Sequence, residues 1–148
     1  MSDDGRFSLA AYAVIADKRG RILLTRRRTS EDWVLPGGTV RAGEAPWETV
    51  GRETSEETGL QVDVERLVGV YTKRRERDVV FVFEATRTGG DLRPSDERDR
   101  VEFVDPAALP EHTSSWDRER IADALRRFIT PVLSVQPSAG EEPPEGVR

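Results

Sequence analysis

The chain has 148 residues, of which 36% are hydrophobic and 34% charged, and its formal net charge is −5. This length suits one globular domain, and the acidic balance argues against general nucleic-acid binding, because phosphates favour Lys and Arg. The lack of cysteine excludes disulfides, Cys-based zinc sites and cysteine nucleophiles, while the single histidine, His112, leaves little for a catalytic triad.

The N-terminal segment, MSDDGRF, is acidic and lacks the apolar core of a secretory signal. No apolar run approaches the roughly 20 residues needed to span a bilayer. We therefore expect a cytoplasmic protein that does not insert into a membrane and that is a monomer or a homodimer.

The first part of the chain predicts a hairpin followed by a break. Apolar residues at 7–16 and 21–27 predict two strands, and the DKRG turn between them predicts that they pair with each other. The Pro-Gly-Gly sequence that begins at Pro36 is expected to interrupt regular structure, with a short strand at 39–40.

A helix is predicted from about Ala45 to Thr58. Pro46 suits the first helical turn, where its missing N–H costs nothing, and Gly59 suits the left-handed position that ends a helix. One helical face collects the residues expected to pack inward, which are Trp47, Val50, Gly51, Thr54 and Thr58. The other face carries the acidic residues and is expected to look onto a cavity or solvent.

The second half predicts two strands, 61–73 and 78–86, joined by the basic RRER segment. A long loop then leads to a short strand at 101–104. With one helix in the centre and one near the C-terminus, this order of elements predicts an α/β fold around a mixed sheet.

The last helix is expected to start at Ser114 or Ser115 and to run to about Phe128. Its inward stripe is predicted to consist of Ile121, Leu125 and Phe128. The domain is expected to cover 1–133, and the segment 134–148 to be a disordered tail, because PSAGEEPPEGVR almost lacks apolar residues.

Three glutamates crowd the end of the predicted central helix, in the sequence GRETSEETG. Glu53, Glu56 and Glu57 stand at positions i, i+3 and i+4, so they share one face and repel one another by a few tenths of a kcal/mol per pair. The helix dipole also disfavours negative charge there. Either the face is simply solvated, or it holds a hard divalent cation such as Mg²⁺, which reverses the sign of the interaction.

The sequence from Gly38 to Leu60, GTVRAGEAPWETVGRETSEETGL, resembles the signature of the Nudix hydrolases. That signature is a Gly, five residues, a Glu, seven residues, and then Arg-Glu-aliphatic-x-Glu-Glu-x-Gly-aliphatic. The matching positions are Gly38, Glu44, Arg52, Glu53, Glu56, Glu57, Gly59 and Leu60. Thr54 departs from the aliphatic residue of the family, and its methyl group can still pack inward.

The resemblance implies an α/β/α sandwich with a central mixed sheet. It also implies metal-dependent hydrolysis of a nucleoside diphosphate linked to another moiety. Glu53, Glu56 and Glu57 would hold Mg²⁺ or Mn²⁺, with Glu53 or Glu56 also acting as base. Arg52 would orient a glutamate, reaching Glu56 one turn on or Glu48 one turn back.

The other motif positions have supporting roles by the same resemblance. The carbonyl of Gly38 would add a metal ligand, and Glu44 would support the junction between the loop and the helix. Gly37 and Gly59 belong to the turns at either end of the motif.

Residues outside the motif give further candidates. Glu97 is either an additional metal ligand or base, or a solvated loop carboxylate, and Asp96 and Asp99 compete for the same role. Arg26 or Arg28 is expected to contact substrate phosphates. Trp33 either stacks on a base or sugar, or belongs to the core.

The substrates that the resemblance admits are nucleoside triphosphates, ADP-ribose or other nucleotide sugars, and dinucleoside polyphosphates. The alternative function is a catalytically weak Nudix-like module that senses a nucleotide by binding it. Loss of motif glutamates would favour that alternative, and all of them are present.

Overall fold

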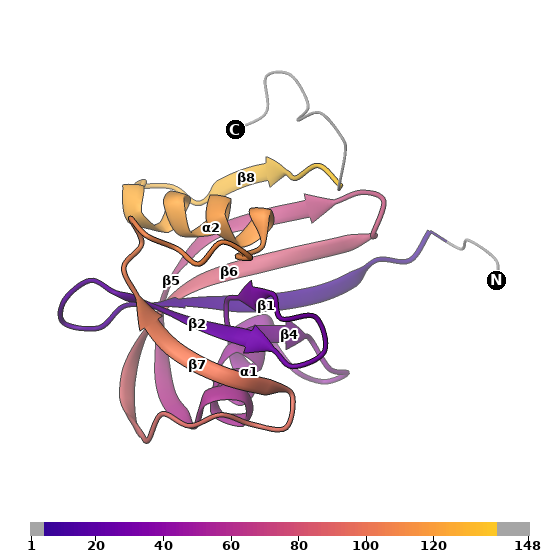
Figure 1. Ribbon diagram of the computed structural model, residues 1–148. Helices are drawn as coiled ribbons and strands as arrows, with labels where there is room; N and C mark the ends of the chain where they lie inside the picture. The colour runs from indigo at the N-terminus through magenta and orange to yellow at the C-terminus, as the bar shows by residue number, and fades with distance from the viewer. Residues whose placement is uncertain (1–4, 139–148) are drawn as a thin grey trace.

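The computed structural model describes residues 5–138, shown in Figure 1. The elements are β1 (Ser8–Ile15), β2 (Ile22–Arg27), β3 (Trp33–Val34), β4 (Gly37–Thr39), α1 (Pro46–Thr58), β5 (Leu60–Lys73), β6 (Asp78–Gly90), β7 (Arg98–Val104), α2 (Ser115–Arg126) and β8 (Val132–Val135). In this described part of the chain, neither helix has the length and apolar character required to cross a membrane.

The strands of the described residues form two sheets. The larger sheet has the order β4-β1-β6-β5-β8, and the smaller one has the order β3-β2-β7. Strand β1 runs parallel to β6 and antiparallel to β4, while β5 is antiparallel to β6 and parallel to β8. The larger sheet is therefore mixed, as the sequence predicts.

The two helices cover different core clusters. Along β1, Ala11 and Ala13 join the cluster that contains Val50 of α1. Val14, the residue after Ala13, joins the cluster that contains Ile121 of α2. Because successive side chains of a strand point to opposite faces, α1 and α2 lie on opposite faces of the larger sheet. This layering confirms the predicted α/β/α sandwich (Figure 1).

The predicted hairpin between the first two strands is wrong. The chain does turn sharply, with the Asp17 N–H donating to the Arg21 carbonyl at 2.9 Å, but beyond an isolated bridge from Ala16 to Ile22 the strands separate. Both edges of β1 are occupied by β4 and β6, so β2 pairs instead with β3 and β7 in the other sheet. The first turn thus connects the two sheets.

Pro36 interrupts regular structure between β3 and β4, as expected. Gly37 and Gly38 do not, because they pair with β1 and begin β4, which spans Gly37–Thr39 rather than the expected 39–40. Gly37 has a φ of 151°, and a Cβ there would lie 2.3 Å from the carbonyl oxygen of Ala11. Glycine therefore allows β4 to approach β1 closely while adopting a backbone angle that other residues rarely take.

Helix α1 agrees with the predicted range, but its buried face differs. Trp47 is 57% exposed, whereas Glu57, expected on the open face, is only 2% exposed. Val50, Thr54 and Thr58 are buried as predicted. The acidic end of α1 is therefore enclosed by other elements rather than turned wholly to solvent.

Helix α2 buries a polar face in place of the predicted apolar stripe. Ile121 is buried, but Leu125 and Phe128 are 50% and 46% exposed. The buried positions are instead Asp117, Arg120, Ile121, Asp123 and Ala124. The spacing of apolar residues predicted the wrong buried face for α2. The polar side chains on the observed buried face are tolerated there because they form hydrogen bonds with other segments of the chain.

The C-terminal part of the described chain is tied to the domain. The expected boundary between domain and tail, at residues 133/134, falls inside β8. Beyond the strand, Gln136 is 1% exposed, and the indole N–H of Trp116 donates to the Pro137 carbonyl at 2.9 Å. The rest of the predicted tail, residues 139–148, lies outside the described residues.

Asp117 connects α2 to the segment that precedes β4. Its Oδ2 accepts from the Leu35 N–H at 3.2 Å, and its Oδ1 accepts from Arg120 Nη1 at 3.0 Å. Asp117 and Arg120 are almost fully buried. A buried pair of this kind leaves an uncompensated charge when one partner is removed.

We predict that Asp117→Ala lowers the free energy of unfolding by about 3–5 kcal/mol, because it leaves Arg120 buried without its carboxylate. Urea denaturation followed by circular dichroism would measure the change. Asp117→Asn, which keeps an oxygen acceptor, should be less damaging. Equal denaturation midpoints for Asp117→Ala and the wild type would contradict the prediction.

Candidate active site

Specific hydrogen bonds define both ends of α1 and thereby determine where its acidic end lies. At the start, the Glu48 carboxylate accepts a hydrogen bond from the Ala45 N–H at 2.8 Å. At the end, Gly59 has a φ of 80°, and its N–H donates to the Ser55 carbonyl at 3.0 Å. These contacts satisfy backbone groups that a helix leaves unpaired, and they fix which side chains face β4.

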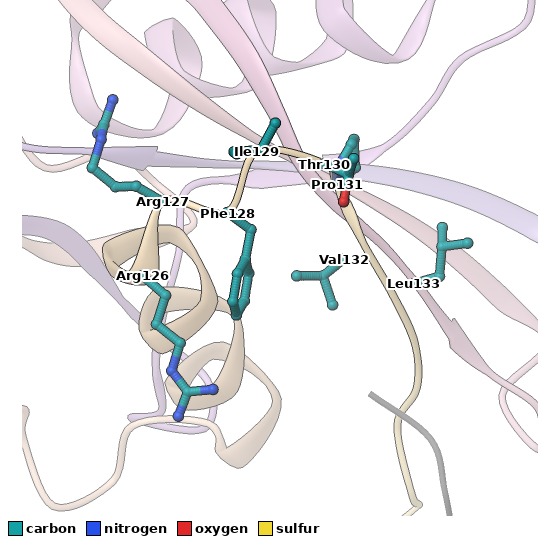
Figure 2. Close-up of a pocket in the computed structure, with 8 residues that line it drawn as sticks. All are labelled: Arg126, Arg127, Phe128, Ile129, Thr130, Pro131, Val132 and Leu133. Atoms are coloured by element: carbon teal, nitrogen blue, oxygen red, sulfur yellow. The ribbon is translucent and has the colours of Figure 1, made fainter.

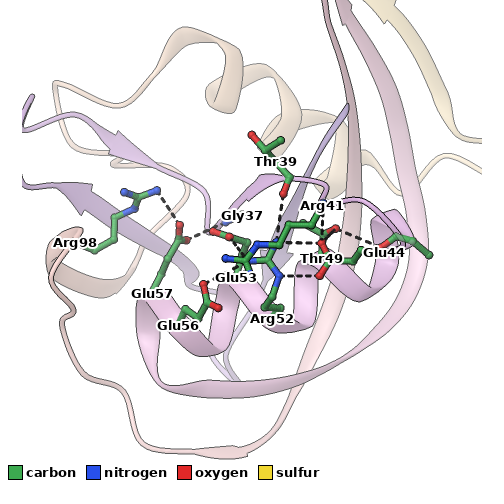
Figure 3. Close-up of polar contacts among 11 residues, drawn as sticks. Gly37, Thr39, Arg41, Glu44, Thr49, Arg52, Glu53, Glu56, Glu57 and Arg98 are labelled. Atoms are coloured by element: carbon green, nitrogen blue, oxygen red, sulfur yellow. Dashed lines mark hydrogen bonds and ion pairs between the residues drawn. The ribbon is translucent and has the colours of Figure 1, made fainter. Parts of the chain in front are cut away.

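Arg52 holds Glu44 in a two-pronged ion pair (Figure 3). Its Nε donates to Oε2 at 2.7 Å and its Nη2 donates to Oε1 at 3.0 Å. Glu44 Oε1 also accepts from the Thr49 hydroxyl and the Arg41 N–H. Hydrogen bonds from Arg52, and then from Thr49, lower the pKa of Glu44 to about 2. Glu44 thereby connects the loop before α1 to the helix.

The same arginine contacts two carboxylates of the motif. Arg52 Nη1 donates to Glu53 Oε1 at 2.5 Å and to Glu56 Oε2 at 3.3 Å. The expected contact with Glu56 is present, whereas Glu48 caps the helix instead. Arg52 therefore offsets the repulsion between carboxylates on adjacent turns.

Glu57 is the buried carboxylate of the motif. Its Oε1 accepts from the Gly37 N–H at 3.0 Å, and its Oε2 accepts from Arg98 Nη2 at 2.8 Å. Burial raises the pKa of Glu57 to about 8; Arg98 and the Gly37 N–H oppose this rise, and the neighbouring Glu53 adds to it. Desolvation outweighs these partners, so the fold holds this carboxylate at a cost.

Gly38 provides room for Glu53. A Cβ at position 38 would lie 2.7 Å from Glu53 Oε2 and 2.9 Å from its Cδ. Any side chain at this position would displace the carboxylate. Gly38 is therefore required for the placement of Glu53. This requirement does not depend on whether the Gly38 carbonyl binds a metal.

The motif carboxylates fit a hard divalent ion in their chemistry. All three offer only oxygen ligands, which Mg²⁺ and Mn²⁺ prefer. Within residues 5–138 no three Asp, Glu, His or Cys side chains converge into a metal-binding cluster. Instead Arg52 engages Glu53 and Glu56, and Arg98 engages Glu57. Guanidinium groups thus balance the charges that a cation would otherwise neutralise.

A cavity of about 380 Å³ opens beside the acidic end of α1. Its lining consists of Glu56, Glu57, Arg93, Pro94, Ser95, Asp96 and Glu97. The fold therefore brings Glu97 next to two motif glutamates, as required if it were a ligand or base. Asp96 lines the same cavity, whereas Asp99 is paired with Arg26 at 2.6 Å, which separates these two competitors.

The other expected substrate contacts are engaged within the protein. Arg26 forms its ion pair with Asp99, and Arg28 donates to the carbonyls of Asp96 and Ser95 at 3.0 and 3.1 Å. Trp33 is 8% exposed and belongs to a core cluster. The structure thus gives Arg28 a part in shaping the cavity loop, and it favours the core interpretation of Trp33.

A larger cavity, of about 580 Å³, lies between the end of α2 and β8 (Figure 2). Its lining consists of Arg126, Arg127, Phe128, Ile129, Thr130, Pro131, Val132 and Leu133. None of these side chains is a carboxylate or an imidazole, so this cavity offers neither a general base nor a hard-metal ligand. We therefore place the candidate active site at α1.

Sequence reasoning missed Arg98 and Thr25. Arg98 is 41 residues away from Glu57, and its Nε also donates to the Thr25 hydroxyl at 3.1 Å. One available signal was the position of Arg98 beside Glu97, a residue already expected near the site. Its pairing with Glu57 depends on the tertiary fold.

Comparison with known proteins agrees with this geometry. Residues 6–125 match the model of the NUDIX domain family. The chain is 36% identical over 118 residues to a MutT-like protein of Streptomyces ambofaciens, covering 80% of this chain and 77% of that protein. It is 37% identical over 124 residues to an ADP-ribose pyrophosphatase of Methanocaldococcus jannaschii, covering 77% of this chain and 70% of that protein.

The fold also resembles solved structures. The crystal structure of a NUDIX hydrolase from Nitrosomonas europaea gives a TM-score of 0.81 at 18% identity, covering 92% of this chain and 82% of that chain. At this identity the likeness concerns the fold alone.

We predict that Gly38→Ala lowers the catalytic rate at least about tenfold, because the new methyl group displaces the Glu53 carboxylate. Since that side chain can move, the free energy of unfolding should change by about 1 kcal/mol or less. Steady-state kinetics and urea denaturation would test both statements.

The matched control is Gly51→Ala, because a Cβ at that helical position meets nothing within 4 Å. It should keep full activity and gain about 1 kcal/mol of stability, the usual advantage of Ala over Gly in a helix. Equal activity of the two variants would contradict the role assigned to Gly38.

Glu44 should make stability depend on pH in the acid range. Its pKa is lowered from 4.5 to about 2 in the folded chain, so its contribution is present above pH 4.5 and is lost as pH falls through about 2. Glu44→Gln should therefore be less stable than the wild type at pH 7, with a difference that shrinks over this window. Urea denaturation across a pH series would show it, and a difference independent of pH would argue against it.

Proposed function

Because the chain belongs to the Nudix family, we propose that α1 holds Mg²⁺ or Mn²⁺ through Glu53, Glu56 and Glu57 and that the substrate is a nucleotide derivative. The chain is a pyrophosphohydrolase, which cleaves a diphosphate linkage. A bound divalent ion would polarise a phosphoryl oxygen and make water a better nucleophile. The remaining steps fall to the residues of the chain.

The observation that carries this proposal is the burial of Glu57 beside two other glutamates of the motif. A solvated helix face would leave all three side chains in water, yet Glu57 is 2% exposed and held at both oxygens. Folding thus accepts the desolvation of a carboxylate at the acidic end of α1. The crowding of like charges on α1 also costs free energy. Two such costs at one place in the fold are typical of a functional site.

Of the two expected bases, Glu56 is better placed to accept a proton from water. Its side chain is 51% exposed and lines the cavity, and its contact with Arg52 is 3.3 Å long. The Glu53 side chain is 14% exposed and lies 2.5 Å from Arg52 Nη1. We therefore assign proton transfer to Glu56 and a fixed ligand role to Glu53, with Glu97 as a further ligand at the rim.

The proposed substrate is a nucleoside diphosphate linked to a second group, such as ADP-ribose. The M. jannaschii relative is an ADP-ribose pyrophosphatase, and its similarity covers most of both chains. Four carboxylates and the guanidinium of Arg93 line the cavity beside α1. Because phosphates need positive charge, Arg93 and the divalent ion would together receive the anionic part of such a substrate.

We predict that Glu56→Gln and Glu57→Gln each lower kcat by at least about a hundredfold, because they remove a base and a metal ligand respectively. Excess EDTA should abolish wild-type activity. The assay would use ADP-ribose, other nucleotide sugars, nucleoside triphosphates and dinucleoside polyphosphates with Mg²⁺ or Mn²⁺, and would identify the products.

Glu48→Gln is the matched control on the same helix, because Gln can also accept the capping hydrogen bond from Ala45. It should keep normal turnover. Full activity of Glu57→Gln, or of the wild type in EDTA, would refute the metal-dependent mechanism. Tight binding of one compound without cleavage of any would favour a nucleotide sensor.

A further inference from the structure

We propose that Arg98 is a positioning residue that holds the Glu57 carboxylate in the orientation required for metal binding. This inference rests on the proposed function, since it takes Glu57 to be a ligand. Arg98 is the first residue of β7 and follows the loop that lines the cavity. It therefore joins the smaller sheet to the acidic end of α1 (Figure 3).

The two oxygens of Glu57 are fixed from two directions. The Gly37 N–H binds Oε1 at 3.0 Å, and Arg98 Nη2 binds Oε2 at 2.8 Å. A carboxylate oxygen can accept more than one contact, so both oxygens retain capacity for a further ligand. Glu57 can thus keep these partners while it also binds a cation.

Arg98 is itself held in place. Its side chain is 11% exposed, and its Nε donates to the Thr25 hydroxyl at 3.1 Å while Nη2 binds Glu57. The Thr25 hydroxyl in turn donates to the Val34 carbonyl at 3.3 Å. This chain of hydrogen bonds runs through the three strands of the smaller sheet to α1. Gly37 belongs to β4 of the larger sheet, so the position of Glu57 is set by both sheets.

Loss of Arg98 has two opposing effects on a cation. It removes a positive charge that repels the ion, and it frees a buried carboxylate that Gly37 alone would then orient. Outer partners of metal ligands commonly contribute about 10–100-fold to metal affinity by fixing ligand orientation. We expect this orientation to dominate, because Arg98 and Glu57 are both shielded from solvent and firmly tethered.

The test is the dissociation constant of Mn²⁺ without substrate, measured by titration calorimetry and by the electron paramagnetic resonance signal of free Mn²⁺. Arg98→Ala should weaken binding about tenfold. Arg98→Lys keeps the charge but cannot reach Thr25 and Glu57 with the same fork, so it should restore only part of the affinity.

Thr25→Val separates orientation from charge, because it removes the anchor of Arg98 and leaves every charge unchanged. It should weaken Mn²⁺ binding in the same direction as Arg98→Ala, by a smaller factor. Arg100→Ala is the control on the same strand, since Arg100 pairs with Glu102 rather than with the motif. Circular dichroism and melting curves would establish that each variant is folded.

The outcomes distinguish this inference from the proposed function. If the wild type and Glu57→Gln bind Mn²⁺ equally, or neither binds it, the metal site itself is wrong. If Glu57→Gln loses affinity while Arg98→Ala and Thr25→Val bind like the wild type, only the role of Arg98 is wrong. Tighter binding by Arg98→Ala would show that charge repulsion dominates, and it would overturn the inference.

Discussion

The burial of one carboxylate, Glu57, is the constraint that organises this end of the molecule. A carboxyl group without water requires charge or hydrogen-bond partners, and Gly37 and Arg98 supply them here. The first partner requires β4 to lie beside α1, and the second requires β7 to begin at the rim of the cavity. The positions of two strands thus have a direct consequence for the chemistry of one side chain.

Arg52 and Arg98 form ion pairs with different carboxylates of the site. Arg52 lies on α1 itself and contacts Glu44, Glu53 and Glu56, so it stabilises the motif from within. Arg98 belongs to β7 of the smaller sheet, and Glu57 is the only one of these carboxylates with which it pairs. Electrostatic repulsion within the helix is therefore reduced locally, whereas the orientation of its buried carboxylate depends on distant segments.

The separation of β1 and β2 into different sheets explains how these segments meet. Because β4 and β6 occupy both edges of β1, β2 continues into the smaller sheet and pairs with β7. Thr25 of β2 then stands beside Arg98. A simple hairpin of β1 and β2 would have left this pairing, and the cavity loop that leads into it, without support.

The sequence by itself determined the limits of α1 and the acidic constellation on it. These features are local, since Pro46, Gly59 and the spacing of the glutamates act within a few turns of one helix. Only the tertiary structure decided that Glu57 is buried, that Trp47 is exposed, and that Arg98 is the partner of Glu57. Helical periodicity gives the direction of a side chain around its axis, but what covers that side depends on which strand edges remain free to pair.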